Sequence, residues 1–254
     1  MLRSELLPPA IERWLLRLAG RASLRGDFPS WQAALAASAA YRTDVSIYGR
    51  FAEEARSGKR SSSRLLSPLL AAMLLAGGRP RVLDFGGNLG HVYFDLVRLR
   101  GDCAASWSVV DLEDIVAYGN VNFSNENLHF YESIGAACGA AGNPNVVLLF
   151  HVLQYLPSPW EYVAQLKAVE PECIVLNEFP VGRRERFMIQ DVLPELGGGS
   201  RPVRIFDEAD VAAAFAGYDL IEELRLPPWD RALAGAAHVA RLYRRKREQF
   251  EVAR

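Results

Sequence analysis

The chain has 254 residues, of which half are hydrophobic and 23% are charged. This mixture can build a hydrophobic core, and it excludes a disordered or fibrous protein. The 29 Lys and Arg residues are balanced by 30 Asp and Glu residues, giving a formal net charge of -1. That balance argues against nucleic acid as the main partner, because phosphate binding usually leaves a basic surplus.

The first part of the chain, up to about residue 77, has the pattern of a helical cap. Apolar residues recur at the spacing of one helix face between positions 11 and 18. A second helix is predicted after Ser30, a candidate N-cap, and a third over residues 65–75. Charged residues interrupt the first twenty positions, and the apolar stretch at 65–76 is too short to span a bilayer. We therefore expect a cytoplasmic protein with no membrane partner.

The three cysteines, Cys103, Cys138 and Cys173, are odd in number and widely spaced. This spacing predicts reduced thiols, with neither a disulfide framework nor a metal site.

From residue 79 onward, short apolar runs alternate with helical stretches. Strands are predicted at 81–85, 107–111, 128–131, 145–150, 173–177, 218–224 and 238–244. Helices are predicted at about 90–100, 112–118, 160–169 and 208–216. This alternation is typical of an α/β fold with a mostly parallel sheet, and the short last connection favours an antiparallel last strand. The predicted division is a cap over residues 1–77 and an α/β domain over 78–254.

The glycine-rich turn at residues 82–90 carries the most information about function. A strand runs into Asp84, Gly86, Gly87 and Gly90, and a helix follows. Such a turn lets the backbone approach a ligand at the carboxyl end of a strand. Asn88 breaks the dinucleotide spacing, and no Gly-Lys-Ser/Thr of a phosphate-binding loop follows. The acid at its start favours a ligand with a cationic amine.

Asp111 ends the second strand of the α/β part, where a carboxylate can accept hydrogen bonds from both ribose hydroxyls. Together with Asp84 it describes a nucleoside pocket without a pyrophosphate clamp, and S-adenosylmethionine (SAM) has that shape and charge. The simpler alternative is that each Asp caps the helix that follows it.

With these motifs the chain resembles the class I SAM-dependent methyltransferases, through residues 82–90, 109–111 and 146–156. The resemblance implies a Rossmann-like, seven-stranded α/β sheet whose last strand is antiparallel. More narrowly, the chain resembles a bacterial group of methyltransferase-like proteins, through Asp84–Phe85–Gly86–Gly87, residues 128–131, residues 152–156, and Trp31 with Ala34 and Tyr41. That group includes enzymes that cyclise SAM to azetidine-2-carboxylate.

The chain departs from these patterns at three places: Asn88 stands where the family usually has Gly, His151 where the group often has Ser, and Asn177–Glu178 where an Asp–Arg pair is frequent. The residues predicted to bind the cofactor are Asp84, Gly86, Gly87, Asn88, Gly90, Asp111, Leu112, Tyr131, Trp31 and Tyr41.

His151, Tyr155 and Asn177 are the candidate catalytic residues, because they lie at predicted strand ends where the crevice opens. The ordinary pKa of histidine suits His151 to the role of a base, and Tyr155 follows one helical turn later. Asn177 could hold a substrate amine or carboxylate, and Glu178 could act as a base. The alternatives are that His151 and Tyr155 only pack beside the cofactor and that Glu178 caps a helix.

Four aromatic residues of the cap, Trp31, Tyr41, Tyr48 and Phe51, are predicted to form a lid. An aromatic face beside the sulfonium would attract that cation by about 0.5–2 kcal/mol. The alternative is that they pack the cap onto the α/β domain. The arginine-rich stretches at 183–186 and 241–247 are interpreted as solvated faces.

Three functions follow from these residues. The first is a SAM-dependent methyltransferase acting on a small molecule, such as a natural-product intermediate or a sugar. The second is intramolecular cyclisation of SAM, in which its α-amine attacks the γ-carbon and methylthioadenosine leaves. The third is a non-catalytic, methyltransferase-like binding subunit. The sequence leaves the oligomeric state open, a homodimer included.

Overall fold

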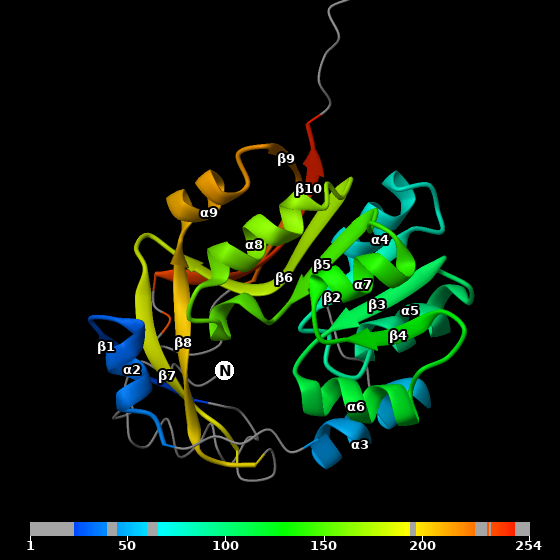
Figure 1. Ribbon diagram of the computed structural model, residues 1–254. Helices are drawn as coiled ribbons and strands as arrows, with labels where there is room; N and C mark the ends of the chain where they lie inside the picture. The colour runs from blue at the N-terminus through cyan, green and yellow to red at the C-terminus, as the bar shows by residue number, and fades with distance from the viewer. Residues whose placement is uncertain are drawn as a thin grey trace, which may run out of the picture.

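The structure, a computed structural model, describes residues 23–39, 45–59, 66–193, 197–226, 233 and 235–246. Within these ranges ten strands are joined into one sheet (Figure 1). Seven of them form a central sheet flanked by helices on both faces. The other three form an antiparallel extension, which we call the annex.

The central sheet confirms the predicted fold class. Its order is β4 (Leu128–Tyr131), β3 (Ser106–Val110), β2 (Arg81–Phe85), β5 (Val146–Phe150), β6 (Cys173–Gly182), β10 (Ala236–Arg245) and β9 (Tyr218–Leu226). The strands from β4 to β6 run parallel, and β10 is antiparallel to both of its neighbours. The last strand, β10, is therefore antiparallel, as the sequence predicts.

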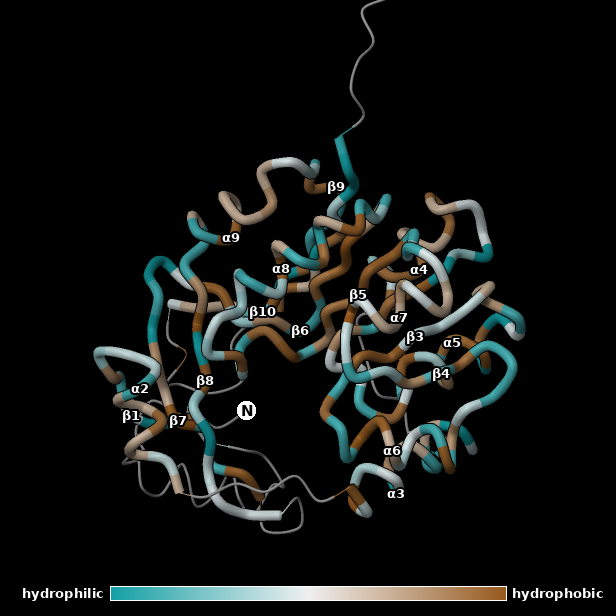
Figure 2. Tube along the Cα trace, in the orientation of Figure 1, coloured by the Kyte–Doolittle hydropathy of each residue, from teal (hydrophilic) through white to brown (hydrophobic). Residues whose placement is uncertain are grey.

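The central strands form because their residues are apolar on both faces of the sheet. In β5 the run Val146–Leu149 is almost fully buried, which is typical of a parallel strand covered on both sides. Figure 2 shows this apolar character along β5 and β6. One face packs against α4 (Ser67–Leu75), α5 (His91–Arg100) and α6 (Glu113–Asn122), and α3 (Val45–Arg56) packs on α5 and α6. The other packs against α7 (Ile134–Ala141), α8 (Pro159–Ala168) and α9 (Glu208–Ala214).

The annex is the part of the fold that the sequence did not predict. It consists of β1 (Ser23–Phe28), β7 (Arg186–Asp191) and β8 (Ser200–Asp207). The helical prediction is wrong for residues 23–28, which pair with β7, a strand far downstream in the chain. The annex joins the central sheet where Val181 and Gly182 of β6 pair with the end of β8.

The helix predicted after Ser30 is confirmed as α2 (Trp31–Ala36), and the Ser30 hydroxyl accepts a hydrogen bond from the Ala33 N–H at 3.1 Å. It lies on the annex (Figure 1). The third predicted helix is confirmed as α4, whereas the pattern at positions 11–18 lies outside the described residues. The division at residue 77 stays a prediction. None of the helices in the described ranges has the length and apolarity needed to cross a bilayer.

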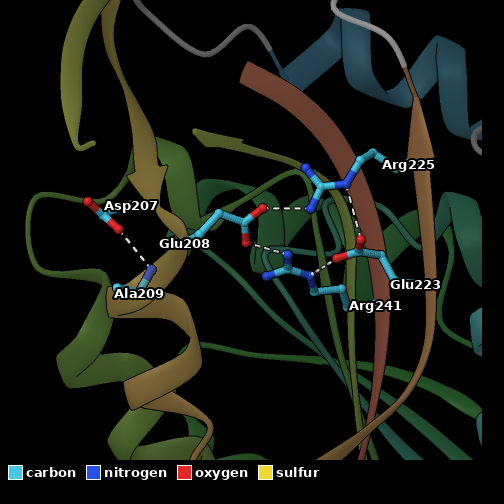
Figure 3. Close-up of polar contacts among 6 residues, drawn as sticks. All are labelled: Asp207, Glu208, Ala209, Glu223, Arg225 and Arg241. Atoms are coloured by element: carbon cyan, nitrogen blue, oxygen red, sulfur yellow. Dashed lines mark hydrogen bonds and ion pairs between the residues drawn. The ribbon is translucent and has the colours of Figure 1, made fainter. Parts of the chain in front are cut away.

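One arginine of the stretch interpreted as a solvated face is in fact buried. Arg241 of β10 is 5% exposed and donates to Glu223 at 2.6 Å and to Glu208. Arg225 of β9 bridges the same two carboxylates, at 2.6 Å to Glu208 and 3.1 Å to Glu223 (Figure 3). The first turn of α9, capped by the Asp207 carboxylate, is thereby tied to the β9–β10 hairpin.

Candidate active site

The turn between β2 and α5 has a backbone that only certain residues can adopt. Gly86 has φ 71°, and a Cβ there would lie 2.3 Å from a Val152 methyl carbon. Gly87 has no unusual φ, but a Cβ there would lie 2.4 Å from the Asp84 carboxyl carbon. Both positions therefore require glycine for reasons of space. Gly90, with φ 79°, leads into α5 and is buried behind the turn.

Asn88 stands where the resemblance leads us to expect glycine, and its backbone has the positive φ that glycine readily adopts. Its φ is 52°, in the left-handed region that Asn tolerates better than most residues. Its Oδ1 accepts the Leu89 N–H at 2.8 Å, and its own N–H donates to Asp111 at 2.8 Å. The departure from the family pattern is therefore compatible with the same turn.

Asp84 lies beneath this turn and is fully buried. Its Oδ2 accepts the Trp107 indole N–H at 3.2 Å, whereas Oδ1 has no hydrogen-bond partner among the described residues. Burial raises the pKa of the Asp84 carboxyl to about 7, with a smaller contribution from the Asp111 charge, against the lowering effect of Trp107. A buried carboxyl held this way is a common feature of functional sites.

Asp111 follows β3 and joins two loops. Its two oxygens accept the N–H groups of Asn88 and Leu112, each at 2.8 Å. Burial raises its carboxyl pKa, and these two backbone hydrogen bonds oppose that rise. Each oxygen keeps a lone pair that a ligand hydroxyl can use.

The turn at Gly86, Gly87 and Asn88 borders a cavity of about 830 Å³ with Asp111, at the carboxyl ends of the central strands. Asp84 is buried beneath the turn and does not line this cavity. Seven predicted residues line it, namely Gly86, Gly87, Asn88, Asp111, Leu112, His151 and Tyr155. Tyr48 and Phe51 of α3 also line it, so two of the four aromatic residues predicted as a lid lie at the cavity. The remaining wall is largely apolar, and it includes Phe85, Val110, Ile115, Phe150, Val152, Leu156, Tyr162 and Pro202.

His151 and Tyr155 form a hydrogen-bonded pair in this cavity. The His151 Nε2 lies 2.8 Å from the Tyr155 hydroxyl, and Nδ1 lies 3.1 Å from the Glu178 carbonyl oxygen. Burial lowers the pKa of His151 to about 4, against the effect of the Glu178 hydrogen bond, and the Arg201 charge lowers it further. The imidazole is therefore neutral at pH 7. Because a carbonyl can only accept, Nδ1 carries the hydrogen, and Nε2 accepts the Tyr155 O–H.

An irregularity in β6 fixes the position of His151. The sequence predicts that this strand ends at Asn177. In the structure it continues to Gly182, and its register against β10 shifts along the way. His151 and Glu178 both have left-handed backbone, with φ 52° and 50°. The Asn177 carbonyl accepts the His151 N–H at 2.9 Å. Such strained residues are often found at functional sites, beside bulged strands.

Other predicted residues lie away from the cavity wall. Asn177 is buried and contributes its backbone carbonyl, while Tyr131 and Gly90 are near the cavity without lining it. Trp31 is buried against the annex, where the Arg204 guanidinium lies 5.8 Å from its ring centre. Tyr41 lies outside the described residues. The catalytic role of Asn177 and the cofactor-binding roles of the other four residues stay predictions.

The annex supplies two residues beside Tyr155 that the sequence did not reveal, and of these Arg201 also lines the cavity. Gln190 of β7 and Arg201 of β8 face each other across the β7–β8 ladder. The Gln190 Oε1 lies 3.0 Å from the Tyr155 hydroxyl, and the Arg201 guanidinium carbon lies 3.7 Å from the centre of the Tyr155 ring. No motif marks either residue. Only the pairing of β7 with β8 brings them to the site.

The described residues contain no cluster of three or more His, Cys, Asp or Glu side chains that could ligate a metal ion.

The sequence matches no protein-family model and no curated protein sequence. Solved structures are similar in fold. A SAM-dependent methyltransferase from Clostridium acetobutylicum superposes with a TM-score of 0.51 at 9% identity, covering 79% of this chain and 99% of that one. At this identity the similarity shows the fold alone. The chain therefore has the class I SAM-dependent methyltransferase fold.

Two further structures give lower scores. A 1,6-didemethyltoxoflavin-N1-methyltransferase from Burkholderia thailandensis, with bound 1,6-didemethyltoxoflavin and S-adenosylhomocysteine, has a TM-score of 0.47 at 16% identity, covering 79% of this chain and 88% of that chain. A SAM-bound aminopentose methyltransferase from Micromonospora echinaspora has a TM-score of 0.45 at 16% identity, covering 76% and 96%.

Proposed function

We propose that the protein is a SAM-dependent methyltransferase acting on a small molecule whose nucleophile bears a proton. The observation that carries this proposal is one cavity bordered by the Asp84–Gly90 turn and Asp111 on one side and by the His151–Tyr155 pair on the other. The cavity volume of about 830 Å³ lies within the range of about 300–1,000 Å³ that small-molecule sites occupy.

The residues on the turn side fit this cofactor. The two Asp111 oxygens would accept the ribose hydroxyls, and the glycines would allow close approach of the cofactor to the backbone. A cationic amine bound over Gly87 would lie near the buried Asp84 carboxyl, whose Oδ1 accepts no hydrogen bond from the part of the chain that the structure describes. The aromatic rings of Tyr48 and Phe51 on the cavity wall suit a ligand with a nucleobase or a sulfonium.

When bound, the cofactor supplies a methyl group already activated for displacement. The chain must then hold the nucleophile in line with that carbon and accept its proton. A nucleophilic hydroxyl becomes far more acidic as it attacks carbon, so a weak base is sufficient. Because its pKa is about 4, His151 is unprotonated at neutral pH, and Tyr155 can pass a proton to its Nε2 while taking one from the nucleophile.

The low basicity of His151 favours methyl transfer over SAM cyclisation. In cyclisation the α-amine must lose its proton before it attacks, and a base with a pKa of about 4 is poorly matched to an ammonium group. The two reactions are separated by incubation with SAM alone. Methylthioadenosine that accumulates without an acceptor identifies cyclisation, and an intact cofactor argues against it.

The first test is calorimetry with S-adenosylhomocysteine. We expect binding by the natural chain and at least about a tenfold loss for Asp111→Ala, because charge-assisted hydrogen bonds contribute about 1.5–3 kcal/mol. The matched control is Asp114→Ala, an exposed carboxylate in the first turn of α6. No binding of SAM or S-adenosylhomocysteine would refute the proposal and leave the non-catalytic binding subunit as the better explanation.

The second test is a screen of small hydroxyl and N–H compounds, including sugars, with SAM. Formation of S-adenosylhomocysteine and a methylated product is followed by mass spectrometry. Tyr155→Phe should retain S-adenosylhomocysteine binding and lose turnover. Equal turnover by that variant would show that Tyr155 does not transfer the proton.

A further inference from the structure

Gln190 and Arg201 hold Tyr155 from the side of the annex. They are directly opposed across the β7–β8 ladder, and the Arg201 Nε–H donates to Gln190 Oε1 at 3.0 Å. The same Oε1 lies 3.0 Å from the Tyr155 hydroxyl oxygen. The Arg201 guanidinium covers the Tyr155 ring at 3.7 Å. A single side chain from β8 therefore contacts the ring of Tyr155 and also one of the two acceptors beside its hydroxyl.

The hydrogen-bond chemistry of these four residues favours one placement of the Tyr155 hydroxyl proton. The donor Arg201 Nε–H requires that the oxygen, and not the nitrogen, of the Gln190 amide faces it. The Tyr155 hydroxyl then lies between two acceptors, Gln190 Oε1 and His151 Nε2, at 3.0 and 2.8 Å. Gln190 Oε1 has a second donor in Arg201, whereas His151 Nε2 has no donor among the described residues other than the Tyr155 O–H, so His151 is the better acceptor for the single hydroxyl proton.

The charges around His151 come from several elements. Arg201 from β8 and His238 from β10 both disfavour a proton on the imidazole, and burial acts in the same direction. The Glu178 backbone carbonyl from β6 and the Tyr155 hydroxyl bond its two nitrogens. Of these groups, Arg201 is the one fixed cation that also touches Tyr155.

We propose that Arg201, anchored by Gln190, is a positioning residue that holds the Tyr155 ring and keeps the Tyr155 hydroxyl directed at His151 Nε2. Its positive charge adds to burial in disfavouring a proton on His151. The effect of this positioning on catalysis rests on the proposed function, in which Tyr155 and His151 accept the proton of the nucleophile. The contacts themselves are made between residues of the chain. It assigns a role to the annex, which completes the proton-accepting pair from outside the central sheet.

The experiment is an NMR titration of the full chain with ¹⁵N-labelled histidine and without ligand. The natural chain should show His151 as the Nδ1–H form, titrating near a pKa of about 4. Arg201→Met should raise the His151 titration midpoint, because it removes a positive charge that disfavours the imidazolium. Arg201→Lys keeps the charge and should stay closer to the natural chain. Gln190→Leu releases the guanidinium and should shift the midpoint upward by less than Arg201→Met.

The matched control is Arg81→Met, the same substitution at the amino-terminal end of β2, at the opposite end of the central strands from the cavity. It should leave the His151 titration unchanged. A midpoint that moves no further in Arg201→Met than in Arg81→Met would overturn the proposal. An unchanged midpoint in Gln190→Leu, beside a shift in Arg201→Met, would overturn the anchoring role of Gln190. Circular dichroism on each variant checks that the fold is retained.

Calorimetry separates positioning from direct ligand binding. Arg201→Met should bind S-adenosylhomocysteine within about threefold of the natural chain, whereas a loss of about tenfold or more would make Arg201 a ligand-binding residue and overturn the proposal. If the natural chain binds no S-adenosylhomocysteine but the His151 titration behaves as expected, the proposed function fails and the positioning role of Arg201 stands.

Discussion

The charge of Asp84 gives the sharpest test of the site, through the substitution Asp84→Asn. The buried carboxyl keeps its proton in the folded chain up to a pKa of about 7, whereas its pKa in the unfolded chain is near the ordinary value of 3.8. The folded state therefore binds the proton more tightly. The stability that this proton provides is fully present below about pH 4 and is lost as the pH rises to about 7.

The size of this effect follows from the two pKa values. A difference of about three units corresponds to roughly 4 kcal/mol in total, of which about 2–3 kcal/mol is expressed between pH 5 and pH 8. The amide oxygen of an asparagine in place of Asp84 would still accept the Trp107 indole N–H, but it carries no charge. We therefore expect Asp84→Asn to gain about that much stability over the natural chain when the pH is raised from 5 to 8.

The assay is urea unfolding of both proteins at several pH values. Asp95→Asn is the contrasting control, because Asp95 is also buried but is ion-paired with Arg98 at 2.7 Å. Removing the charge of that pair should destabilise the chain at neutral pH. A difference in free energy of unfolding between Asp84→Asn and the natural chain that is constant from pH 5 to pH 8 would refute the reasoning.

The same variant tests the proposed cofactor site. A cationic amine over Gly87 would favour the charged form of Asp84, so S-adenosylhomocysteine binding near pH 6.5 should release protons. Calorimetry in two buffers with different ionisation enthalpies measures this release. Asp84→Asn should bind more weakly and release fewer protons. Equal proton release by both proteins would show that the amine does not interact with Asp84.

Three further predictions concern stability and are measured by urea unfolding. Gly87→Ala should destabilise the chain by at least about 2 kcal/mol, because the added methyl group overlaps the Asp84 carboxyl beneath the turn. The control Gly135→Ala should be neutral or stabilising, because the space around Gly135 is open among the described residues. Equal effects would contradict the close contact. Arg241→Met should cost about 3 kcal/mol because it leaves two carboxylates without their buried partner, and Arg225→Met, with a 48% exposed side chain, less than about 1 kcal/mol. Asn88→Ala should cost about 1–2 kcal/mol of stability, because alanine is strained in the left-handed backbone conformation, whereas Asn88→Gly should stay near neutral. A larger loss of stability in Asn88→Gly would show that the Asn side chain matters more than its φ.

The central sheet was predictable because its signals are local. The run at 146–150 is apolar at every position, and this indicates a strand buried on both faces whatever else it pairs with. The glycine turn was predictable for a similar reason, since Asp84, Gly86 and Gly87 lie within four positions of one another and the Asp84 carboxyl packs under Gly87. The cavity residues nearest to these motifs could be predicted from sequence because they follow the same strand ends.

The annex was not predictable because its pairing is long-range and its strands are polar. β8 contains Arg201, Pro202 and Arg204, which suggest a loop, although Arg204 is 8% exposed and lies near three aromatic rings. Its ion pair with Glu185, at 2.6 Å, also places part of an apparently solvated stretch against the fold. Gln190 and Arg201 therefore escaped detection, since they become neighbours of Tyr155 only once β7 and β8 have paired.

The opposite pKa shifts of Asp84 and His151 define where the proposed chemistry can operate. A carboxylate facing a cation requires Asp84 to lose its proton, which in the free chain happens above a pKa of about 7. A proton acceptor requires His151 to be neutral, which holds above a pKa of about 4. Both conditions are met together from neutral pH upward, and a bound cation would extend the range to lower pH by favouring the charged Asp84. Burial causes both pKa shifts, but a bound cofactor would lower only the pKa of Asp84. The acidic limit of activity should therefore follow Asp84 when the cofactor is scarce, and His151 when it is saturating.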